Sequence, residues 1–156
     1  MKNRIAAACA VTLLLCWFAT HGNLGVSVAA AQSSDVAAQF IGSWALVSFT
    51  NVDDDGNTIH QYGENAFGRI SYDERGRMMV VLMRRGREDI SDGDFFSYTG
   101  SYDIDEVAGT VTHHVEACNA PSWVGTDRVR TFEMLNGDRI ALRPVEGTSE
   151  LVWQRE

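Results

Sequence analysis

The polar residues best suited to chemistry gather in two strand-like stretches late in the chain. His113 and His114 fall in the stretch Thr110–Cys118, and Arg130 lies in the stretch Arg128–Leu135. Side chains alternate between the two faces of a strand, so His113 and His114 cannot line the same pocket. Apolar residues occupy the alternate positions around His113. The pattern therefore predicts that His113 faces inward and that His114 faces outward.

The neighbours of His113 depend on how these two stretches pair. An antiparallel pairing that brings Ala117 near Arg128 would put His113 beside Phe132 and would place Arg130 on the same inner face. A slip of one residue would turn every side chain to the other face, and the sequence leaves the register open.

Two tyrosines on the preceding stretch complete a candidate site. Tyr98 and Tyr102 alternate with Gly100, so we expect both to face the space that His113 faces. Arginine offers a forked donor, tyrosine a hydroxyl group, and histidine a proton acceptor near neutral pH. Among apolar walls, these groups suit a small ligand with a carbonyl, carboxylate or enol group. The predicted ligand-binding residues are His113, Arg130, Tyr98, Tyr102 and Phe132.

Three functions remain open for these residues. They could hold a small apolar or amphipathic molecule, or they could transfer protons in a cofactor-independent isomerase, cyclase or lyase that acts on a small carbonyl compound. They could also form a buried polar network that closes one end of the fold. Arg130 is informative because an unpaired buried guanidinium costs several kcal/mol. Without a carboxylate in reach, its natural partner is an anionic or carbonyl-bearing ligand.

Several classes of chemistry have no support in the sequence. Lys2 is the only lysine, so a lysine Schiff base is excluded once the N-terminus is removed. The chain has no Cys-x-x-Cys, His-Glu-x-x-His or Gly-x-Ser-x-Gly motif, and no phosphate-binding or dinucleotide-binding glycine pattern. We therefore expect no cofactor and no functional metal. The formal charge of −8 also argues against nucleic acid as a partner.

Turn signals recur at short intervals and predict an all-β fold. Sequential antiparallel strands in this number close most naturally into a single up-and-down barrel of eight to ten strands, because closure removes exposed edges. A short helical plug over Asp35–Ile41, capped by Ser34, would cover one end. The expected strands are Trp44–Asn51, Thr58–Tyr62, Phe67–Tyr72, Arg77–Arg84, Phe95–Tyr102, Thr110–Cys118, Arg128–Leu135, Arg139–Arg143 and Leu151–Arg155.

The expected strand Arg77–Arg84 is apolar on both faces. Met78, Val80 and Leu82 alternate with Met79 and other apolar residues. Its outer face would need a cover, which a homodimer contact or a loop would supply.

The N-terminus carries a secretory signal pattern. Lys2 and Arg4 precede an apolar stretch that ends in small residues at Ala29–Ala31. We therefore expect a signal peptide over residues 1–31, an N-terminal segment over 32–40 and a barrel domain over 41–156. The mature protein would be periplasmic or extracellular, with no stable membrane association. An uncleaved membrane anchor is one alternative, although the apolar stretch is short for a span. A lipoprotein is another, although neither Cys9 nor Cys16 suits lipid modification.

The chain resembles bacterial and fungal lipocalin-like domains, a largely uncharacterised family with a calycin-like barrel. In lipocalins, a motif like Gly42-Ser43-Trp44 places its tryptophan across the closed end, and an arginine late in the last strand, here Arg155, packs over the indole. Gly42, Trp44 and Arg155 are thus expected to close the barrel. The Thr-Asp-Tyr motif of secreted transport lipocalins is absent. The other stretches that carry the resemblance are Tyr62–Tyr72, Tyr98–Tyr102, Val111–Glu116, Trp123–Thr126 and Leu151–Arg155.

Overall fold

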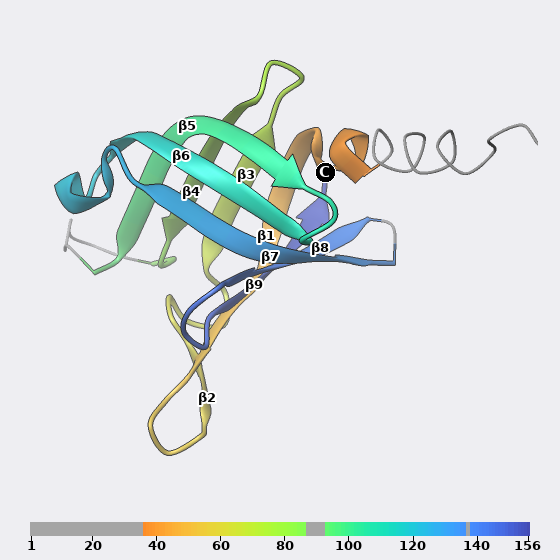
Figure 1. Cartoon of the computed structure of the whole chain (residues 1–156). Helices are drawn as coiled ribbons and strands as arrows, with labels where there is room; N and C mark the ends of the chain where they lie inside the picture. Colours follow the sequence, from red (N-terminus) through yellow and green to blue (C-terminus); the bar gives the residue numbers. More distant parts are fainter. Residues whose placement is uncertain (1–35, 87–92, 137) are drawn as a thin grey trace, which may run out of the picture.

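The computed structural model of the chain describes residues 36–86, 93–136 and 138–156 (Figure 1). The predicted signal peptide over residues 1–31 lies outside these residues, as do Ser34 and Asp35, the expected start of the helical plug. No helix among the described residues is both long enough and apolar enough to cross a membrane.

Nine strands and two short helical turns make up most of the described chain, and the bounds follow the turn signals closely. Two strands, β3 and β6, have the predicted bounds, and the others differ by a few residues at their ends. The elements are β1 (Gly42–Val52), β2 (Thr58–His60), β3 (Phe67–Tyr72), β4 (Arg77–Met83), β5 (Phe95–Asp105), β6 (Thr110–Cys118), the 3-10 turn η1 (Pro121–Trp123), β7 (Asp127–Leu135), β8 (Arg139–Pro144) and β9 (Glu150–Arg155).

The strands close into one barrel, which confirms the predicted fold class. From β3 to β9 each strand pairs antiparallel with the next, β1 pairs with β3, and β9 returns to pair with β1. The short strand β2 pairs only with the end of β1, at Thr50–Val52, and forms a hairpin that projects beyond the barrel (Figure 1). Closure leaves no long unpaired edge among the eight strands of the barrel wall.

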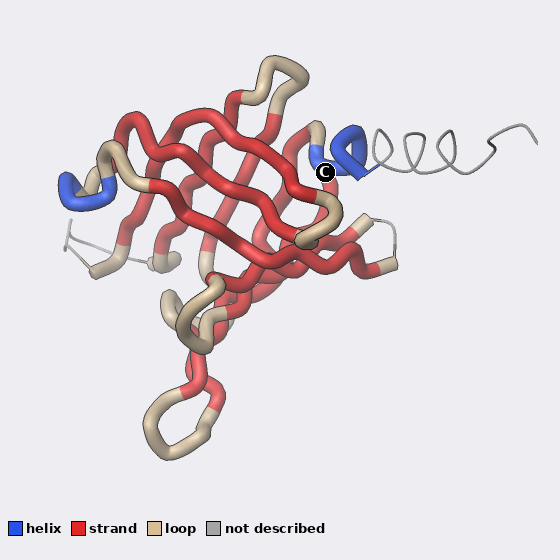
Figure 2. Tube along the Cα trace, viewed as in Figure 1, coloured by secondary structure: helices blue, strands red, loops and turns tan. Residues whose placement is uncertain are grey.

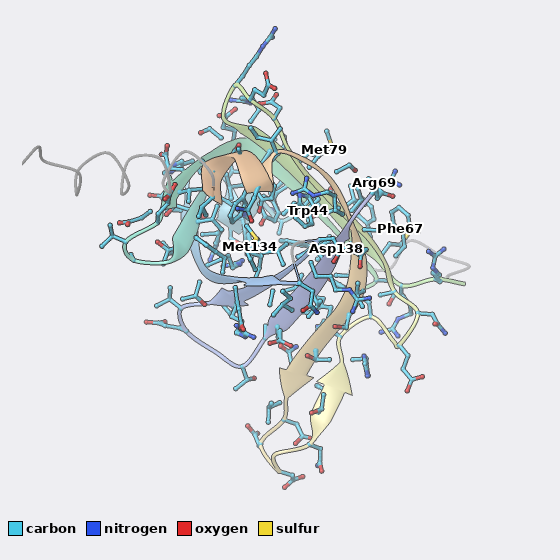
Figure 3. The ribbon with its side chains drawn as sticks, turned by 90° about the vertical axis from the view of Figure 1, so that its right-hand side faces the viewer. Trp44, Phe67, Arg69, Met79, Met134 and Asp138 are labelled. Atoms are coloured by element: carbon cyan, nitrogen blue, oxygen red, sulfur yellow. The ribbon has the colours of Figure 1, made fainter. Side chains whose placement is uncertain are left out.

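Alternation along β4 shows how the barrel divides inner from outer side chains. Met78, Val80 and Leu82 point inward and are 2%, 2% and 5% exposed. Met79 lies on the outer face and is 54% exposed, and Figure 3 shows it projecting away from the barrel, as Arg69 does. The outer face of β4 therefore has an exposed apolar side chain, and no described segment covers it.

One end of the barrel is closed by aromatic residues and one arginine. Residues 36–40 form a helical turn, and the fully buried Phe40 accepts a hydrogen bond from Trp44 Nε1 at 2.9 Å. The Arg155 guanidinium lies 4.1 Å from the centroid of the Trp44 ring and donates to the Ile41 carbonyl at 2.8 Å and to the Gln39 carbonyl. This turn and η1 lie on opposite sides of the strands in Figure 2.

A β-bulge fixes the position of β6 against β5. Thr99 pairs with Ala117, but Gly100 pairs with Val115, so Glu116 is the extra residue. A Cβ atom at Gly100 would lie 1.8 Å from the His114 carbonyl oxygen, which no side chain could tolerate without movement of the backbone. Gly100 therefore allows the close approach that sets where His113 lies along the barrel.

Candidate functional site

The barrel contains a cavity of about 440 Å³ in the half away from the helical turn. This volume is in the range of pockets that hold small organic molecules. Most of its wall is apolar and comes from six strands: Phe49, Ile70, Val80, Leu82, Phe96, Leu142, Leu151 and Trp153.

The polar centre of the cavity is His113, which is 1% exposed and is the one polar or charged residue in the buried set of the described chain. The Tyr98 hydroxyl lies 2.7 Å from its Nδ1 atom and the Tyr72 hydroxyl lies 2.8 Å from its Nε2 atom. His113 and Tyr98 both line the cavity, whereas Tyr72 is buried behind them and is not part of the lining. The imidazole is thus held rigidly by two phenols from β3 and β5.

Burial keeps all three rings uncharged over the physiological range. Removal from water lowers the pKa of His113 to about 3, and the positive charge of Arg130 acts in the same direction. Burial raises the pKa of Tyr98 to about 12, against the opposing charge of Arg130, and raises the pKa of Tyr72 well above its ordinary value. His113 is therefore a neutral hydrogen-bonding group at pH 7.

The strand β7 brings two arginines to the cavity beside His113. The expected register was wrong: His113 pairs with Arg128 rather than with Phe132, and Val111 pairs with Arg130. The difference is four residues along β7, and because this number is even, the inward face of the strand is unchanged. Arg128 and Arg130 both line the cavity, and sequence analysis had placed only Arg130 there.

The two arginines are incompletely paired. The Arg128 guanidinium stacks 3.7 Å from the centroid of the Trp123 ring, but its buried Nε has no hydrogen-bond partner among the described residues. Arg130 donates from Nη1 to the Val129 carbonyl at 3.2 Å. In the part of the chain that the structure describes, neither side chain forms an ion pair. Glu146 is a carboxylate in the cavity lining and is an exposed residue.

Two of the five predicted ligand-binding residues lie outside the cavity lining. Tyr102 packs its ring 4.8 Å from that of Tyr72 and donates to the Asp73 carbonyl at 3.0 Å. Phe132 packs 5.1 Å from Phe40 beneath the helical turn. Neither lines the cavity. His113, Arg130 and Tyr98 do come together, and Tyr102 and Phe132 belong to the closed end.

Sequence analysis missed Arg128, Tyr72 and Trp123. The alternation along β7 contained the signal for Arg128, because it stands two residues before Arg130 on the same face. No short-range pattern pointed to Tyr72, which reaches His113 from a strand that pairs with neither β5 nor β6. Trp123 is the last residue of η1, which begins at Pro121, and its place over the cavity depends on how the loop between β6 and β7 folds.

The other histidine of this strand faces the outer surface. The His114 ring lies between two carboxylates, at 2.7 Å from Asp127 and 2.9 Å from Asp103, and these hydrogen bonds raise its pKa. No group of three or more potential metal ligands occurs among the described residues.

Comparisons with known proteins place the barrel in a family. The lipocalin-like domain family matches residues 41–155. No curated protein matches the chain. Among solved structures, the chain is similar to an uncharacterized protein from Bacteroides eggerthii, with 11% identity over 75% of this chain and 99% of the other and a TM-score of 0.46.

Two further solved structures show similar values. One is a DUF4847 family protein from Bacteroides vulgatus, with 11% identity over 77% of this chain and 96% of the other and a TM-score of 0.46. The second is a de novo designed fluorescence-activating β-barrel, with 16% identity over 78% of this chain and 98% of the other and a TM-score of 0.43. Because the family match spans almost all of the barrel, the chain belongs to the lipocalin-like domain family.

Proposed function

We propose that the protein is an exported carrier or sensor of a small molecule with an apolar body and an anionic head group. The observation that carries the proposal is the pair Arg128 and Arg130, two guanidinium groups in one apolar cavity with no ion pair among the described residues. The barrel fold itself is consistent with the binding of small molecules.

The charge balance of the cavity supports an anion. Two arginines and one exposed glutamate line it, and the arginines repel each other as well as losing hydration. A carboxylate or another oxyanion would accept charge-assisted hydrogen bonds from the fork of a guanidinium. The apolar wall opposite would bury the rest of the ligand.

The state of His113 favours binding over acid–base catalysis. A general base works best when its pKa lies near the working pH and when a ring nitrogen is free to reach the substrate. Both nitrogens of His113 are already engaged by tyrosine hydroxyls, and its pKa is about 3. His113 is therefore suited to holding a polar network in place rather than to accepting a substrate proton.

Export is part of the proposal and is supported by the N-terminal sequence. Residues 1–31 combine two basic residues, an apolar stretch and a small-residue end without any acidic residue. Intact mass spectrometry of the protein from its own host tests this part. Removal of about the first 31 residues is expected, and an intact Met1 would contradict export by cleavage.

A matched pair of fluorescent probes tests the binding proposal. 1-Anilinonaphthalene-8-sulfonate and N-phenyl-1-naphthylamine share the same ring system and differ by the sulfonate. Both probes are titrated against the full chain and against Arg130→Met. The comparison separates the contribution of the sulfonate to the binding affinity from the contribution of the buried rings. Loss of a hydrogen bond to a charged group costs about 1.5–3 kcal/mol, so Arg130→Met should weaken sulfonate binding about tenfold or more.

The control is Arg139→Met, because Arg139 is exposed on β8 and bonds to Gln154. It should change the affinity for neither probe, and Arg130→Met should leave the affinity for the uncharged probe unchanged. If Arg130→Met and Arg139→Met reduced sulfonate binding equally, the anion would be attracted by the overall charge and not by the cavity. That result would refute the proposed site.

A further inference from the structure

The chain of hydrogen bonds from Tyr72 through His113 to Tyr98 has a direction. A neutral imidazole carries one N–H group and one bare nitrogen, so one ring nitrogen donates and the other accepts. His113 Nε2 faces the Tyr72 hydroxyl at 2.8 Å, and Nδ1 faces the Tyr98 hydroxyl at 2.7 Å. One tyrosine must therefore donate its proton to the ring, and the other must accept and direct its own proton elsewhere.

The surroundings of Tyr72 decide which tyrosine donates. Tyr72 is 2% exposed, and His113 is the one hydrogen-bond partner of its hydroxyl among the described residues. If Nε2 carried the proton, the Tyr72 hydroxyl proton would be buried without an acceptor, which is costly. If Nδ1 carries it, Tyr72 donates to Nε2 and every group behind the cavity wall is satisfied.

The surroundings of Tyr98 accommodate the opposite role. Tyr98 lines the cavity, so a proton that points away from His113 can reach a molecule held there. Arg130, another lining residue, acts on the Tyr98 hydroxyl through its positive charge, which opposes the rise in the pKa of Tyr98. The Tyr98 oxygen can thus accept from His113 while its O–H group donates into the cavity.

We propose that His113 is a positioning residue, held by Tyr72 as the Nδ1–H tautomer, which turns the Tyr98 hydroxyl into a hydrogen-bond donor toward the ligand. The proposal rests on the proposed function and deepens it, because it specifies the head group. Arg130 and the Tyr98 hydroxyl would both act as donors here, so they accept a deprotonated oxyanion and disfavour a head group that must itself donate to them, such as an amine or an ammonium group.

Among the described residues, Trp153 adds a second unpartnered donor to the cavity. Trp153 is 1% exposed and lines the cavity, and its buried Nε1–H group has no hydrogen-bond partner among the described residues. An indole N–H group can only donate. The polar groups of the cavity that lack partners, Arg128 Nε and Trp153 Nε1, are therefore both donors.

The tautomer can be measured without any ligand. Long-range ¹H–¹⁵N correlation spectra of the ¹⁵N-labelled full chain at pH 7 distinguish a protonated nitrogen from a bare one in the His113 ring, assigned by comparison with His113→Gln. The expected result is a protonated Nδ1 and a bare Nε2. A protonated Nε2 would overturn the proposal and would leave the role of Arg130 untouched.

Substitution of the two tyrosines tests the consequence for binding, with 1-anilinonaphthalene-8-sulfonate as the probe. Tyr98→Phe should weaken sulfonate binding about tenfold, because it removes a hydrogen bond to a charged group. Tyr72→Phe should weaken it in the same direction, by about two- to tenfold, although Tyr72 does not line the cavity. Without Tyr72 the ring loses its bias toward the Nδ1–H tautomer, and Tyr98 can turn its proton to His113.

The double variant and the uncharged probe complete the test. Tyr72→Phe/Tyr98→Phe should bind the sulfonate no more weakly than Tyr98→Phe, because both changes act through one hydroxyl. Binding of N-phenyl-1-naphthylamine should be unchanged in all folded variants. If Tyr72→Phe binds the sulfonate as the unaltered chain does, the relay is refuted. A failure of Arg130→Met to reduce sulfonate binding would instead refute the proposed function.

Discussion

The two ends of the barrel place an arginine against a tryptophan in the same way but complete the arrangement differently. At the closed end, Arg155 stacks 4.1 Å from Trp44 and donates to two backbone carbonyls. In the cavity, Arg128 stacks 3.7 Å from Trp123, but its Nε has no hydrogen-bond partner among the described residues. The stacked Arg155 therefore stabilises the closed end. The stacked Arg128 leaves an N–H donor available in the cavity.

The difference separates structural from functional arginines without reference to any ligand. A buried polar group that is fully satisfied by the chain stabilises the fold, whereas one that lacks a partner is costly unless something else supplies it. Arg155 belongs to the first kind and Arg128 to the second, whereas Arg130 donates one hydrogen bond and forms no ion pair among the described residues. Changes at the closed end should therefore reduce stability, and changes at the cavity arginines should reduce ligand binding.

The largest effect on stability is expected from truncation of the closed-end tryptophan. Trp44 is 1% exposed, so Trp44→Ala should lower the free energy of unfolding by about 3–5 kcal/mol. Trp123 is only half-buried, so Trp123→Ala should cost clearly less. Urea denaturation followed by circular dichroism measures both. Equal losses would show that the two ends do not differ in the way described.

The next effect concerns pH and the buried imidazole. Burial lowers the pKa of His113 to about 3, whereas a histidine in the unfolded chain has its ordinary pKa of 6.5. Below that value the unfolded chain binds a proton that the folded chain does not, so stability falls as the pH falls toward 3. The free energy of unfolding should decrease by up to about 1.4 kcal/mol per pH unit from this group.

The window between about pH 6.5 and pH 4.5 isolates this contribution, because unfolded carboxyl groups titrate mainly below it. His114 has a raised pKa, so its stabilising contribution is complete below pH 6.5 and is lost only as the pH rises through its folded value. Urea denaturation of His113→Gln over this window should show a flatter slope than the unaltered chain. An unchanged slope would mean that His113 is not held neutral by burial.

A smaller effect distinguishes the arginines themselves. Arg155→Met removes a cation–π contact and two hydrogen bonds, and should lower the free energy of unfolding by about 1–2 kcal/mol. Arg130→Met should change it by no more than about 0.5 kcal/mol, since Arg130 donates one hydrogen bond, to the Val129 carbonyl, and is repelled by Arg128. Thermal unfolding of both variants provides the comparison. A larger loss for Arg130→Met would make Arg130 a structural residue.

The fold was predictable from sequence because the turn residues, the alternation of apolar side chains and the closure of the barrel all indicate the same architecture. Turn residues bounded the strands, and alternation assigned the inner face of β6. The number of sequential strands then left a closed barrel as the natural way to bury the edges. These signals act over a few residues, so they can be found in a single sequence.

The site was only partly predictable because it depends on contacts across the barrel. The inner face of β7 was recoverable from alternation, but its register against β6 depends on the loop that contains η1. The position of β6 against β5 depends in turn on the bulge at Gly100. The link between Tyr72 and His113 joins strands that are not neighbours in the sheet. No periodicity along the chain encodes such a contact, so it appears only in three dimensions.

The account is tested most directly by a crystal structure of the chain bound to 1-anilinonaphthalene-8-sulfonate. The account predicts that the aromatic rings lie inside the barrel against the wall formed by Val80 and Leu82, with the sulfonate in hydrogen-bonding contact with Arg130 and the Tyr98 hydroxyl. A probe bound on the outer face near Met79, or one inside the barrel with its sulfonate turned away from both arginines, would contradict it.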